Sequence, residues 1–313
     1  MQTFLLVDGN AIMHRAFHAL PPFKTQEGVP THVVYGFFSI IYKAITDFSP
    51  VYLAICFDTP ALTFRNKIFK EYQIQRPKIA DDFISQIPLV KKGLDFGGIL
   101  HLEKDGFEAD DLLGTIAKKI GLLFDKKIKV LILSGDRDML QLTDRNIFVV
   151  SPQIGFSTSK IYDTNEVVKK FMVTPSQIVD YKALVGDPSD NYSGAKGIGP
   201  KTASKLINKF QTVENLLKNL KKIENPKLKI ILEENKDNIF LSKKLAKILT
   251  DVKIDFDFDK TKFTGFKNEL KDFLLKLEMN SLAKRIFKQP SSPKDKISKD
   301  KKKKTNDQQI GLF

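Results

Sequence analysis

The chain has very little cysteine: Cys56 is the only one among 313 residues. A single thiol cannot form a disulfide within the chain, so we expect a reducing, cytoplasmic setting. The N-terminal apolar run, residues 3–7, is too short for a signal peptide, and no apolar run approaches membrane-spanning length. Cys56 lies in the apolar run 51–57, which predicts a buried structural thiol rather than a nucleophile.

Two further patterns are missing. The P-loop spacing G-x-x-x-x-G-K-[ST] is absent, which argues against a nucleoside triphosphatase. The four histidines show no pairing with cysteine at metal-ligand spacing, so we interpret them as structural or surface residues: His14, His18, His32 and His101.

The charge balance is strongly positive. Lys and Arg number 51 against 37 Asp and Glu, a formal net charge of +14. Such an excess attracts polyanions, of which nucleic acid is the commonest. Charge alone leaves open the alternative of lysine side chains that simply solvate the surface.

Short apolar runs alternate with longer segments of helical periodicity. Residues 3–7, 51–57 and 128–134 are typical of buried strands, and residues 33–47 and 110–124 of helices. This alternation predicts an α/β fold with a mostly parallel sheet and helices on both faces. We expect sites just beyond the carboxyl ends of such strands.

The rest of the chain divides by composition. Residues 60–90 mix basic and aromatic side chains and predict a partly helical excursion from the sheet. We expect a core over 1–173, a lysine-rich helical region over 174–288, and a disordered tail over 289–313.

Acidic residues follow the predicted strands and open the loops beside them. Because these loops meet at one edge of the sheet, we expect nine carboxylates to converge: Asp8, Asp58, Glu108, Asp110, Asp111, Asp136, Asp138, Asp187 and Asp190. Bare carboxylates would repel one another, and hard divalent cations with oxygen ligands relieve that repulsion. Two such ions about 4 Å apart can hydrolyse a phosphodiester. Taken singly, the acids at 108–111 also suit a helix N-terminus, and Asp58 suits a turn.

A glycine-rich turn precedes a predicted helix. Gly197 and Gly199 flank Ile198, and Lys201 and Thr202 follow. Backbone N–H groups at such a helix start bind phosphate without reading bases, as in helix–hairpin–helix motifs. The alternative is an ordinary turn between two helices.

Several short segments along the chain resemble the 5′ nuclease family and occur in the same order as in that family. The family includes the 5′–3′ exonuclease domain of bacterial DNA polymerase I, phage 5′ nucleases and flap endonucleases. The segments that carry the resemblance are residues 7–10, 15–22, 34–37, 57–58, 64–65, 76–77, 108–111, 134–139, 186–191 and 197–199. It implies a PIN-like fold with a helical arch near 60–90 and a C-terminal helix–hairpin–helix region. It also implies a monomeric 5′–3′ exonuclease and structure-specific 5′-flap endonuclease, acting in primer removal and repair. No polymerase portion follows, so we expect a free-standing form.

The resemblance also implies roles for individual residues. The first metal site would use Asp8, Asp58, Glu108 and Asp110. The second would use Asp136, Asp138 and Asp190 and share Asp110, while Asp111 and Asp187 would act through water or in an outer shell. The cofactors implied are two or three Mg²⁺ ions, with Mn²⁺ as an alternative, and K⁺ at the hairpin. The catalytic set would be Arg76, Asp8, Asp110 and Asp138.

Contacts to DNA follow from the same resemblance. Arg76 would contact the scissile phosphate, and Tyr72 would stack on a base. Arg15 would have a phosphate role, with a structural ion pair as the alternative. The full set of implied DNA contacts is Arg15, Arg65, Tyr72, Arg76, Gly197, Gly199, Lys201 and Thr202.

One position departs from the family pattern. The family usually has Lys directly after the tyrosine that matches Tyr72, and here the residue is Gln73. Glutamine keeps a hydrogen-bond donor and loses the charge that would act at the cleaved phosphate. This departure supports an alternative function, a catalytically weak DNA-junction-binding protein tethered to the sliding clamp. A PIN-type ribonuclease is a third hypothesis, against which the hairpin and the long excursion favour duplex DNA.

The last five residues resemble the short peptide by which bacterial proteins bind the sliding clamp. Its residues would be Gln309, Ile310, Leu312 and Phe313, at the end of a lysine-rich linker. The alternative is a chance apolar end on a polar tail.

Overall fold

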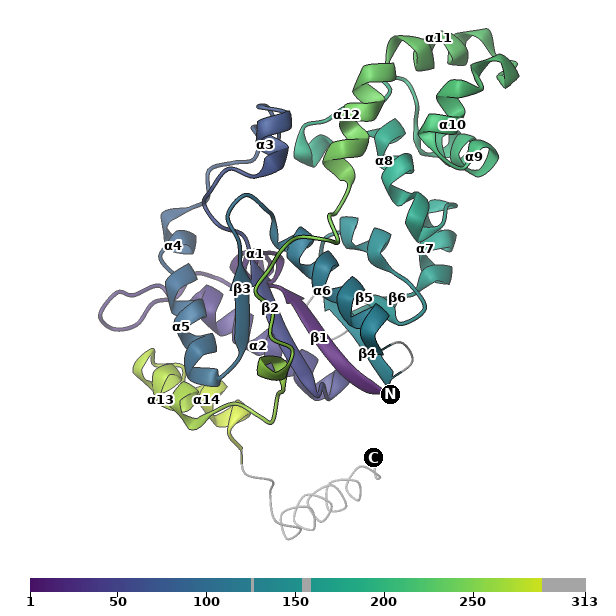
Figure 1. Ribbon diagram of the computed structural model, residues 1–313. Coiled ribbons are helices and arrows are strands. Elements are labelled where there is room, and N and C mark those ends of the chain that lie inside the picture. The colour runs from purple at the N-terminus through teal and green to yellow at the C-terminus, as the bar shows by residue number, and fades with distance from the viewer. Residues whose placement is uncertain (125–126, 154–158, 289–313) are drawn as a thin grey trace, which may run out of the picture.

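A computed structural model describes residues 1–124, 127–153 and 159–288 (Figure 1). Its centre is a six-stranded sheet in the order β3-β2-β1-β4-β5-β6. Strands β1 to β5 run parallel, and β6 is antiparallel to β5. The bounds of the strands are β1 Gln2–Asp8, β2 Tyr52–Phe57, β3 Leu100–Glu103, β4 Ile128–Leu133, β5 Ile147–Pro152 and β6 Ser159–Tyr162. The predicted mostly parallel sheet is therefore confirmed.

Helices cover both faces of this sheet. Side chains alternate along β1, so Phe4 and Leu6 join the core on one face, and Leu5 and Val7 join the core on the other. The first face is covered by α6 (Ala109–Phe124) together with part of the helical region. The second is covered by α1 (Gly9–Ala19), α2 (His32–Phe48), α5 (Ile87–Gly97), α13 (Asn268–Lys276) and α14 (Asn280–Ile286). Burial on both faces explains why the parallel strands are almost continuously apolar.

The strand order reverses between β1 and β4. The chain builds β1, β2 and β3 outward in one direction, then returns to place β4 on the other side of β1. In open parallel sheets, such a switch point leaves a crevice at the carboxyl ends of the strands, where ligands bind. The ends of β1, β2 and β4 are neighbours there, which brings together side chains distant in sequence.

A helical region follows the sheet and projects from it at the upper right of Figure 1. Helix α7 (Thr164–Phe171) leads into it, and it contains α8 (Ile178–Val185), α9 (Pro200–Phe210), α10 (Val213–Lys218), α11 (Pro226–Glu234) and α12 (Lys236–Ala246). Helix α8 packs against both α12 and α9. Short 3-10 helices occur at Asp138–Leu142, Pro175–Gln177, Pro188–Asp190, Leu220–Lys222 and Asp259–Thr261.

After α12 the chain returns across the sheet, in front of β1 and β2 (Figure 1). Phe258 lies 4.5 Å from Tyr52 and 6.1 Å from Phe4, measured between ring centroids. The backbone N–H of Phe263 donates to the carbonyl of Val51 at 2.8 Å, and α13 then packs on α5. The residues described after α12 therefore contact the core, although we predicted from the sequence that they belong to the helical region. The boundaries given above stay predictions.

The excursion between β2 and α5 contains two short helices joined by turns, α3 (Phe64–Ile68) and α4 (Asp81–Ile84). Several aliphatic side chains of this segment are exposed, including those of Leu62 and Ile74. No helix of the described residues is long and apolar enough to cross a membrane. The predicted tail, with the clamp-binding residues, lies outside the described residues.

Candidate active site

The carboxyl ends of the central strands hold acidic side chains in place through neutral donors. Asp8 ends β1 and caps α1: one carboxylate oxygen accepts the Ala11 N–H at 2.9 Å, and the other accepts the Ser134 hydroxyl at 2.7 Å. Asp58 follows β2 and accepts the Ala109 N–H, at the start of α6, at 2.7 Å. Strands and helix starts thus position these groups. We call four residues the sheet carboxylates: Asp8, Asp58, Asp110 and Asp136.

Burial and mutual repulsion shift three of the sheet carboxylates, Asp8, Asp58 and Asp110, toward their protonated forms. Burial raises the pKa of Asp8 to about 7, against the opposing effect of its hydrogen bonds from Ala11 and Ser134. Burial also raises the pKa of Asp58, despite the hydrogen bond from Ala109. The pKa of Asp110 lies well above its ordinary value because of burial, with Asp136 and Asp8 adding to the shift. This cluster therefore requires protons or a cation to compensate its charge.

A second group of acids comes from loops. Asp138 begins a 3-10 helix after β4, and Asp187 and Asp190 lie in the loop after α8. One carboxylate oxygen from each of these three residues lies within 4.8 Å of the other two, a grouping that could hold a metal ion. The structure thus places Asp187 directly beside Asp138 and Asp190, where the resemblance implied a more distant role. Asp136 accepts the N–H of Asp138 at 2.7 Å and so adjoins this group. We call Asp138, Asp187 and Asp190 the loop carboxylates.

Cationic side chains contact the loop carboxylates directly. The Lys182 ammonium in α8 pairs with Asp138 and, at 2.7 Å, with Asp187. Although burial opposes it, the contact with Lys182 and the hydrogen bonds from Ser189 hold the pKa of Asp187 below its ordinary value. Burial raises the pKa of Asp138 to about 7, with Lys182 acting in the opposite direction. The sequence analysis did not identify Lys182 as part of the site. The one indication in the sequence is that Lys182 lies five residues before Asp187.

Asp190 is held by the excursion segment. The Arg76 guanidinium donates to one of its oxygens at 2.7 Å, and the Gln73 side-chain amide donates to the same oxygen at 3.1 Å. The Tyr72 hydroxyl donates to the other oxygen at 3.2 Å. The Arg76 side chain remains 54% exposed, so its guanidinium can also reach a ligand. Gln73 therefore touches the site, at the position where the family usually has lysine.

Glu108 lies between the two groups. Its carboxylate accepts the Thr63 hydroxyl at 3.3 Å and the Tyr72 hydroxyl at 3.4 Å, and it lies 3.4 Å from the Arg65 guanidinium. Burial raises its pKa to about 7, and Arg65 acts against that shift. The acid thus joins the sheet edge to the excursion segment.

Two predicted roles disagree with the structure. Arg65 was expected to contact DNA, but it is only 2% exposed and donates two hydrogen bonds, at 2.7 and 2.9 Å, to the fully buried Asp111. It also donates to the carbonyls of Leu245 and Lys247, both at 2.9 Å. A guanidinium enclosed in this way has no surface for DNA, and its partner Asp111 is committed to Arg65 and to the Leu249 N–H. Both residues are interior parts of the scaffold that joins α3, α6 and the segment after α12.

A base-stacking role for Tyr72 also disagrees with its position. The residue is 5% exposed, and its ring is packed in a small core cluster with Tyr192, Leu245 and Ala246. It offers the site a hydroxyl rather than an aromatic face. Arg15, in α1, donates to the carbonyl of Gln153 just beyond β5, so it lies at the sheet edge that bears the carboxylates.

The predicted hairpin leads directly into α9. Gly197 adopts φ +98, a left-handed conformation that side chains rarely accept, and Gly199 is the N-cap of α9. Lys201 and Thr202 lie in the first turn of α9, where Pro200 has no N–H and the Thr202 N–H donates to the Gly199 carbonyl at 3.1 Å. The preceding loop closes tightly, since a Cβ on Gly186 would lie 2.5 Å from the carbonyl carbon of Ser193.

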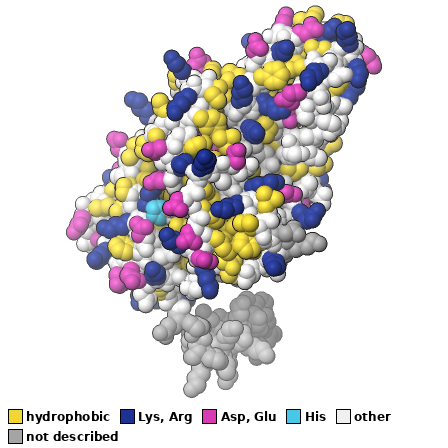
Figure 2. Space-filling model, viewed as in Figure 1, with side chains coloured by type: hydrophobic (Ala, Val, Ile, Leu, Met, Phe, Trp, Pro, Cys, Tyr) yellow, Lys and Arg dark blue, Asp and Glu magenta, His cyan; other side chains and the backbone are white. Residues whose placement is uncertain are grey.

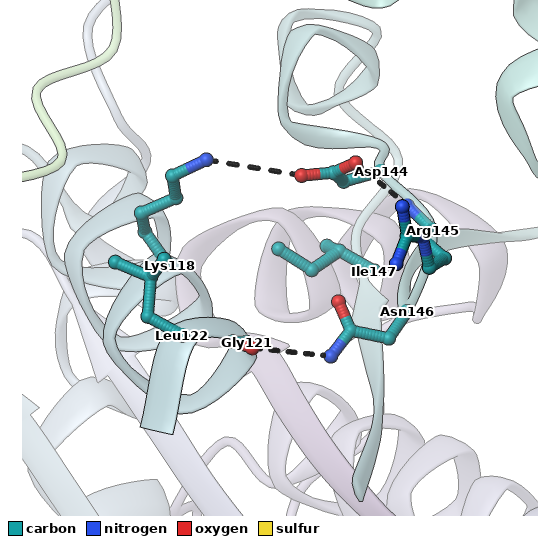
Figure 3. Close-up of a pocket in the computed structure, with 7 residues that line it drawn as sticks. All are labelled: Lys118, Gly121, Leu122, Asp144, Arg145, Asn146 and Ile147. Atoms are coloured by element: carbon teal, nitrogen blue, oxygen red, sulfur yellow. Dashed lines mark hydrogen bonds and ion pairs between the residues drawn. The ribbon is translucent and has the colours of Figure 1, made fainter. Parts of the chain in front are cut away.

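A hollow at the opposite edge of the sheet is separate from these groups. It has a volume of about 190 Å³ and lies where β4 and β5 begin, whereas the carboxylates lie where the strands end (Figure 3). Lys118 and Asp144 face each other across it, 3.8 Å apart. Its lining residues are Lys118, Gly121, Leu122, Asp144, Arg145, Asn146 and Ile147. It brings together no group of acids and takes no part in the site.

An edge of converging carboxylates, together with a hairpin of the phosphate-binding type, defines a nuclease of the parallel α/β class. Family models agree. The 5′-3′ exonuclease N-terminal resolvase-like domain matches residues 3–172, and the 5′-3′ exonuclease C-terminal SAM fold matches residues 173–269. The chain belongs to the 5′–3′ exonuclease family.

Individual relatives support this assignment. A 5′-3′ exonuclease of Aquifex aeolicus is 41% identical over 297 residues, covering 93% of this chain and 98% of that protein. DNA polymerase I of Bacillus subtilis is 38% identical over 283 residues, which cover 90% of this chain but only 32% of the polymerase. The chain thus spans nearly the whole of the first relative and about a third of the second.

Solved structures share the fold. The T5 D15 protein co-crystallised with metal ions superposes with a TM-score of 0.67 at 21% identity, covering 90% of this chain and all of that one (100%). The catalytic core of Rad2 in complex with DNA substrate superposes with a TM-score of 0.58 at 16% identity, covering 92% of each chain. The predicted fold and the predicted nuclease, a DNA-binding hydrolase, are confirmed, and the junction-binding alternative is not supported.

Proposed function

We propose that this nuclease hydrolyses DNA phosphodiesters with divalent metal ions, both as a 5′–3′ exonuclease and at 5′ flaps. The observation that carries the proposal is the convergence of the sheet carboxylates at the ends of neighbouring parallel strands, where burial raises the pKa values of Asp8, Asp58 and Asp110. Its setting would be primer removal and repair in the cytoplasm, with the protein acting as a monomer.

The acidic residues fit a pair of hard cations. Asp8, Asp58, Glu108 and Asp110 would hold one ion, and Asp136, Asp138 and Asp190 the other, with Asp110 shared and Asp187 close to the second. Mg²⁺ or Mn²⁺ bound there would supply an activated water and stabilise the leaving oxygen. A related T5 5′-exonuclease has been solved with divalent zinc ions, which supports this proposal. The protein's own part is to hold the ligands in place through Ala11, Ser134 and Ala109.

Other residues would position the DNA. Arg76 lies beside Asp190 and is half exposed, so it would bind the phosphate that is cleaved. Arg15 would bind a neighbouring phosphate. The exposed aliphatic and lysine side chains between residues 60 and 84 would lie along the unpaired 5′ strand.

The double-stranded part of the DNA would be bound farther from the carboxylates. The α9 N-terminus would grip its backbone through Gly197, Gly199, Lys201 and Thr202, with K⁺ between protein and phosphate. Figure 2 shows Lys and Arg side chains over the whole visible face, including the projecting helical region. Such a spread favours backbone contacts that do not depend on sequence. Binding of a sliding clamp by Gln309, Ile310, Leu312 and Phe313 also remains a proposal.

A labelled 5′-flap DNA tests the proposal. We would incubate it with the full chain in Mg²⁺ and in EDTA, beside Asp110→Asn and the control Asp272→Asn, which changes an exposed acid on α13. Cleavage near the junction that requires both metal and Asp110, and that survives in the control, is the expected result. Tight flap binding without cleavage under any condition would overturn the proposal in favour of the junction-binding alternative.

A further inference from the structure

Lys182 lies where a second cation would have to bind. One oxygen from each loop carboxylate lies within 4.8 Å of the others, and the Lys182 ammonium contacts two of the three residues, Asp138 and Asp187. We infer that Lys182 is a built-in counter-ion that competes with a divalent cation for the loop carboxylates, and thereby weakens binding of one divalent ion to the DNA-free protein. This inference rests on the proposed function and concerns only the second ion.

The ammonium is fixed in this position. Its side chain is 13% exposed and projects from α8, which packs against α12. Helix α8 is further tied to α12 by Lys243, which pairs with the buried Asp180 at 2.6 Å. A lysine carried by an anchored helix cannot leave the acids as easily as one on a flexible loop. The charge therefore stays beside the carboxylates before any ion arrives.

The ammonium also remains charged. An ammonium held against the carboxylates of Asp138 and Asp187 is stabilised in its charged form. Lysine offers three donors and no acceptor, so it satisfies carboxylate oxygens that a metal ion would otherwise bind. An arriving divalent ion must both share these oxygens and overcome repulsion by the ammonium.

Asp8 and Asp58, two ligands proposed for the first ion, accept no hydrogen bond from a cation in the contacts that the structure describes. The hydrogen bonds to Asp8 and Asp58 come from two backbone N–H groups and a serine hydroxyl, all of which are neutral. Neutral donors around a metal site orient ligands and increase affinity, whereas a cation on the ligand oxygens opposes the entry of positive charge. Loss of the Lys182 charge should therefore affect one ion of the pair and leave the other unchanged.

Manganese binding by the DNA-free full chain tests the inference. Free Mn²⁺ would be followed by electron paramagnetic resonance during titration of the wild type, Lys182→Met, Lys182→Gln and Lys182→Arg. The control is Lys169→Met, which removes the same charge from an exposed position on α7. We expect both neutral variants to bind the weaker Mn²⁺ about tenfold more tightly, and the arginine variant and the control to match the wild type.

Thermal melting gives a second readout that does not require activity. In EDTA the neutral variants should melt below the wild type, because the loop carboxylates lose their counter-ion, and Mn²⁺ should raise their melting temperature by more than it raises that of the wild type. Unchanged or weaker Mn²⁺ binding by both neutral variants, in a wild type that binds Mn²⁺ and cleaves flaps, would overturn this inference alone. A wild type that binds no Mn²⁺ would overturn the proposed function as well.

Discussion

The two halves of the acidic site solve the same electrostatic problem in different ways. Asp8 and Asp58 among the sheet carboxylates are held by backbone N–H groups and by the Ser134 hydroxyl, and burial raises the pKa of Asp8 to about 7. The loop carboxylates are held by Lys182 and Arg76, and the pKa of Asp187 falls despite its burial. Neutral groups therefore hold Asp8 and Asp58, whereas the protein supplies direct cationic partners to the loop carboxylates, among which burial still raises the pKa of Asp138 to about 7.

Rigidity differs in parallel with charge. Asp8 and Asp58 follow the central strands of a sheet buried on both faces, so their positions are set by the core. Asp187 and Asp190 lie in a loop that keeps its shape through the close approach of Gly186 to Ser193 and through its cationic partners. We conclude that a rigid sheet can tolerate unpaired acids, while a loop needs countercharge to stay in place.

Substitution of one sheet carboxylate and one loop carboxylate should show whether the two groups contribute differently to the cleavage rate. We expect Asp8→Asn to lower single-turnover cleavage of a flap about a thousandfold, since it removes a proposed metal ligand whose hydrogen bonds come from neutral groups. Asp187→Asn should cost about ten- to a hundredfold, because Asp138 and Asp190 still face the same ion. Comparable losses in the two variants, measured at saturating Mg²⁺, would show that the halves are equivalent and that this comparison is wrong.

The interior ion pair gives the next largest effect. Arg65→Met should lower the free energy of unfolding by about 3–5 kcal/mol, because it leaves Asp111 buried without its partner. The double variant Arg65→Met/Asp111→Leu should recover much of that loss. Denaturant unfolding measures both, with Arg145→Met, at an exposed arginine, as control.

DNA binding distinguishes this interior role from the one predicted from sequence. If Arg65 contacted a phosphate, its removal would lower the slope of log affinity against log salt by about one. We expect the slope for Arg65→Met to equal that of the wild type at a temperature where both are folded. A reduced slope with unchanged stability would return Arg65 to the DNA interface.

The strand ends were the part of the site most readily predicted. The apolar runs are almost continuous, each ends at or beside an acid, and parallel strands place their carboxyl ends at one edge, so Asp8, Asp58 and Asp136 could be placed together. The hairpin was predicted for a similar reason, because Gly197 needs the φ of +98 that it adopts. Local patterns decide such features, and they are visible in a single sequence.

The charge partners could not be predicted in the same way. Lys182 and Asp138 are 44 residues apart, and only the packing of α8 beside the sheet edge brings them together. Arg65 belongs to a basic segment, and a basic residue type is rarely fully buried, so composition indicated a surface role. The return of the chain after α12 was also missed, because its Phe256 and Phe258 follow no helical or strand period that reveals a partner.

Stability should depend on pH in the metal-free protein. The pKa values of Asp8, Glu108 and Asp138 are each raised to about 7, so the folded state binds more protons than the unfolded state between their ordinary values and about pH 7. Stability therefore falls as pH rises through that window and is lowest above it. In EDTA we expect the melting temperature to drop by several degrees between about pH 5 and about pH 8.

Saturating Mg²⁺ should flatten or reverse that dependence, because ionised ligands bind the ion and the ion stabilises the folded state. Asp8→Asn should remove part of the drop in EDTA, since one of the groups that titrate is gone. A melting temperature in EDTA that rises from about pH 5 to about pH 8 would contradict the upward pKa shifts of Asp8, Glu108 and Asp138.

We expect the smallest effect from substitution of Gln73, whose side chain links the excursion segment to Asp190, one of the loop carboxylates. Its amide donates to Asp190 at 3.1 Å, and its own N–H donates to the Asp190 carbonyl at 3.1 Å from a backbone with φ 58. Gln73→Lys should raise the single-turnover rate by no more than about tenfold, because a charge placed beside Arg76 adds to electrostatic stabilisation already present there. Gln73→Met, which keeps the backbone hydrogen bond and removes the side-chain donor, should lower the rate slightly. If lysine lowered the rate as methionine does, the amide contact with Asp190 would matter more than charge, and the loop half would depend on hydrogen-bond geometry rather than on the number of cations around it.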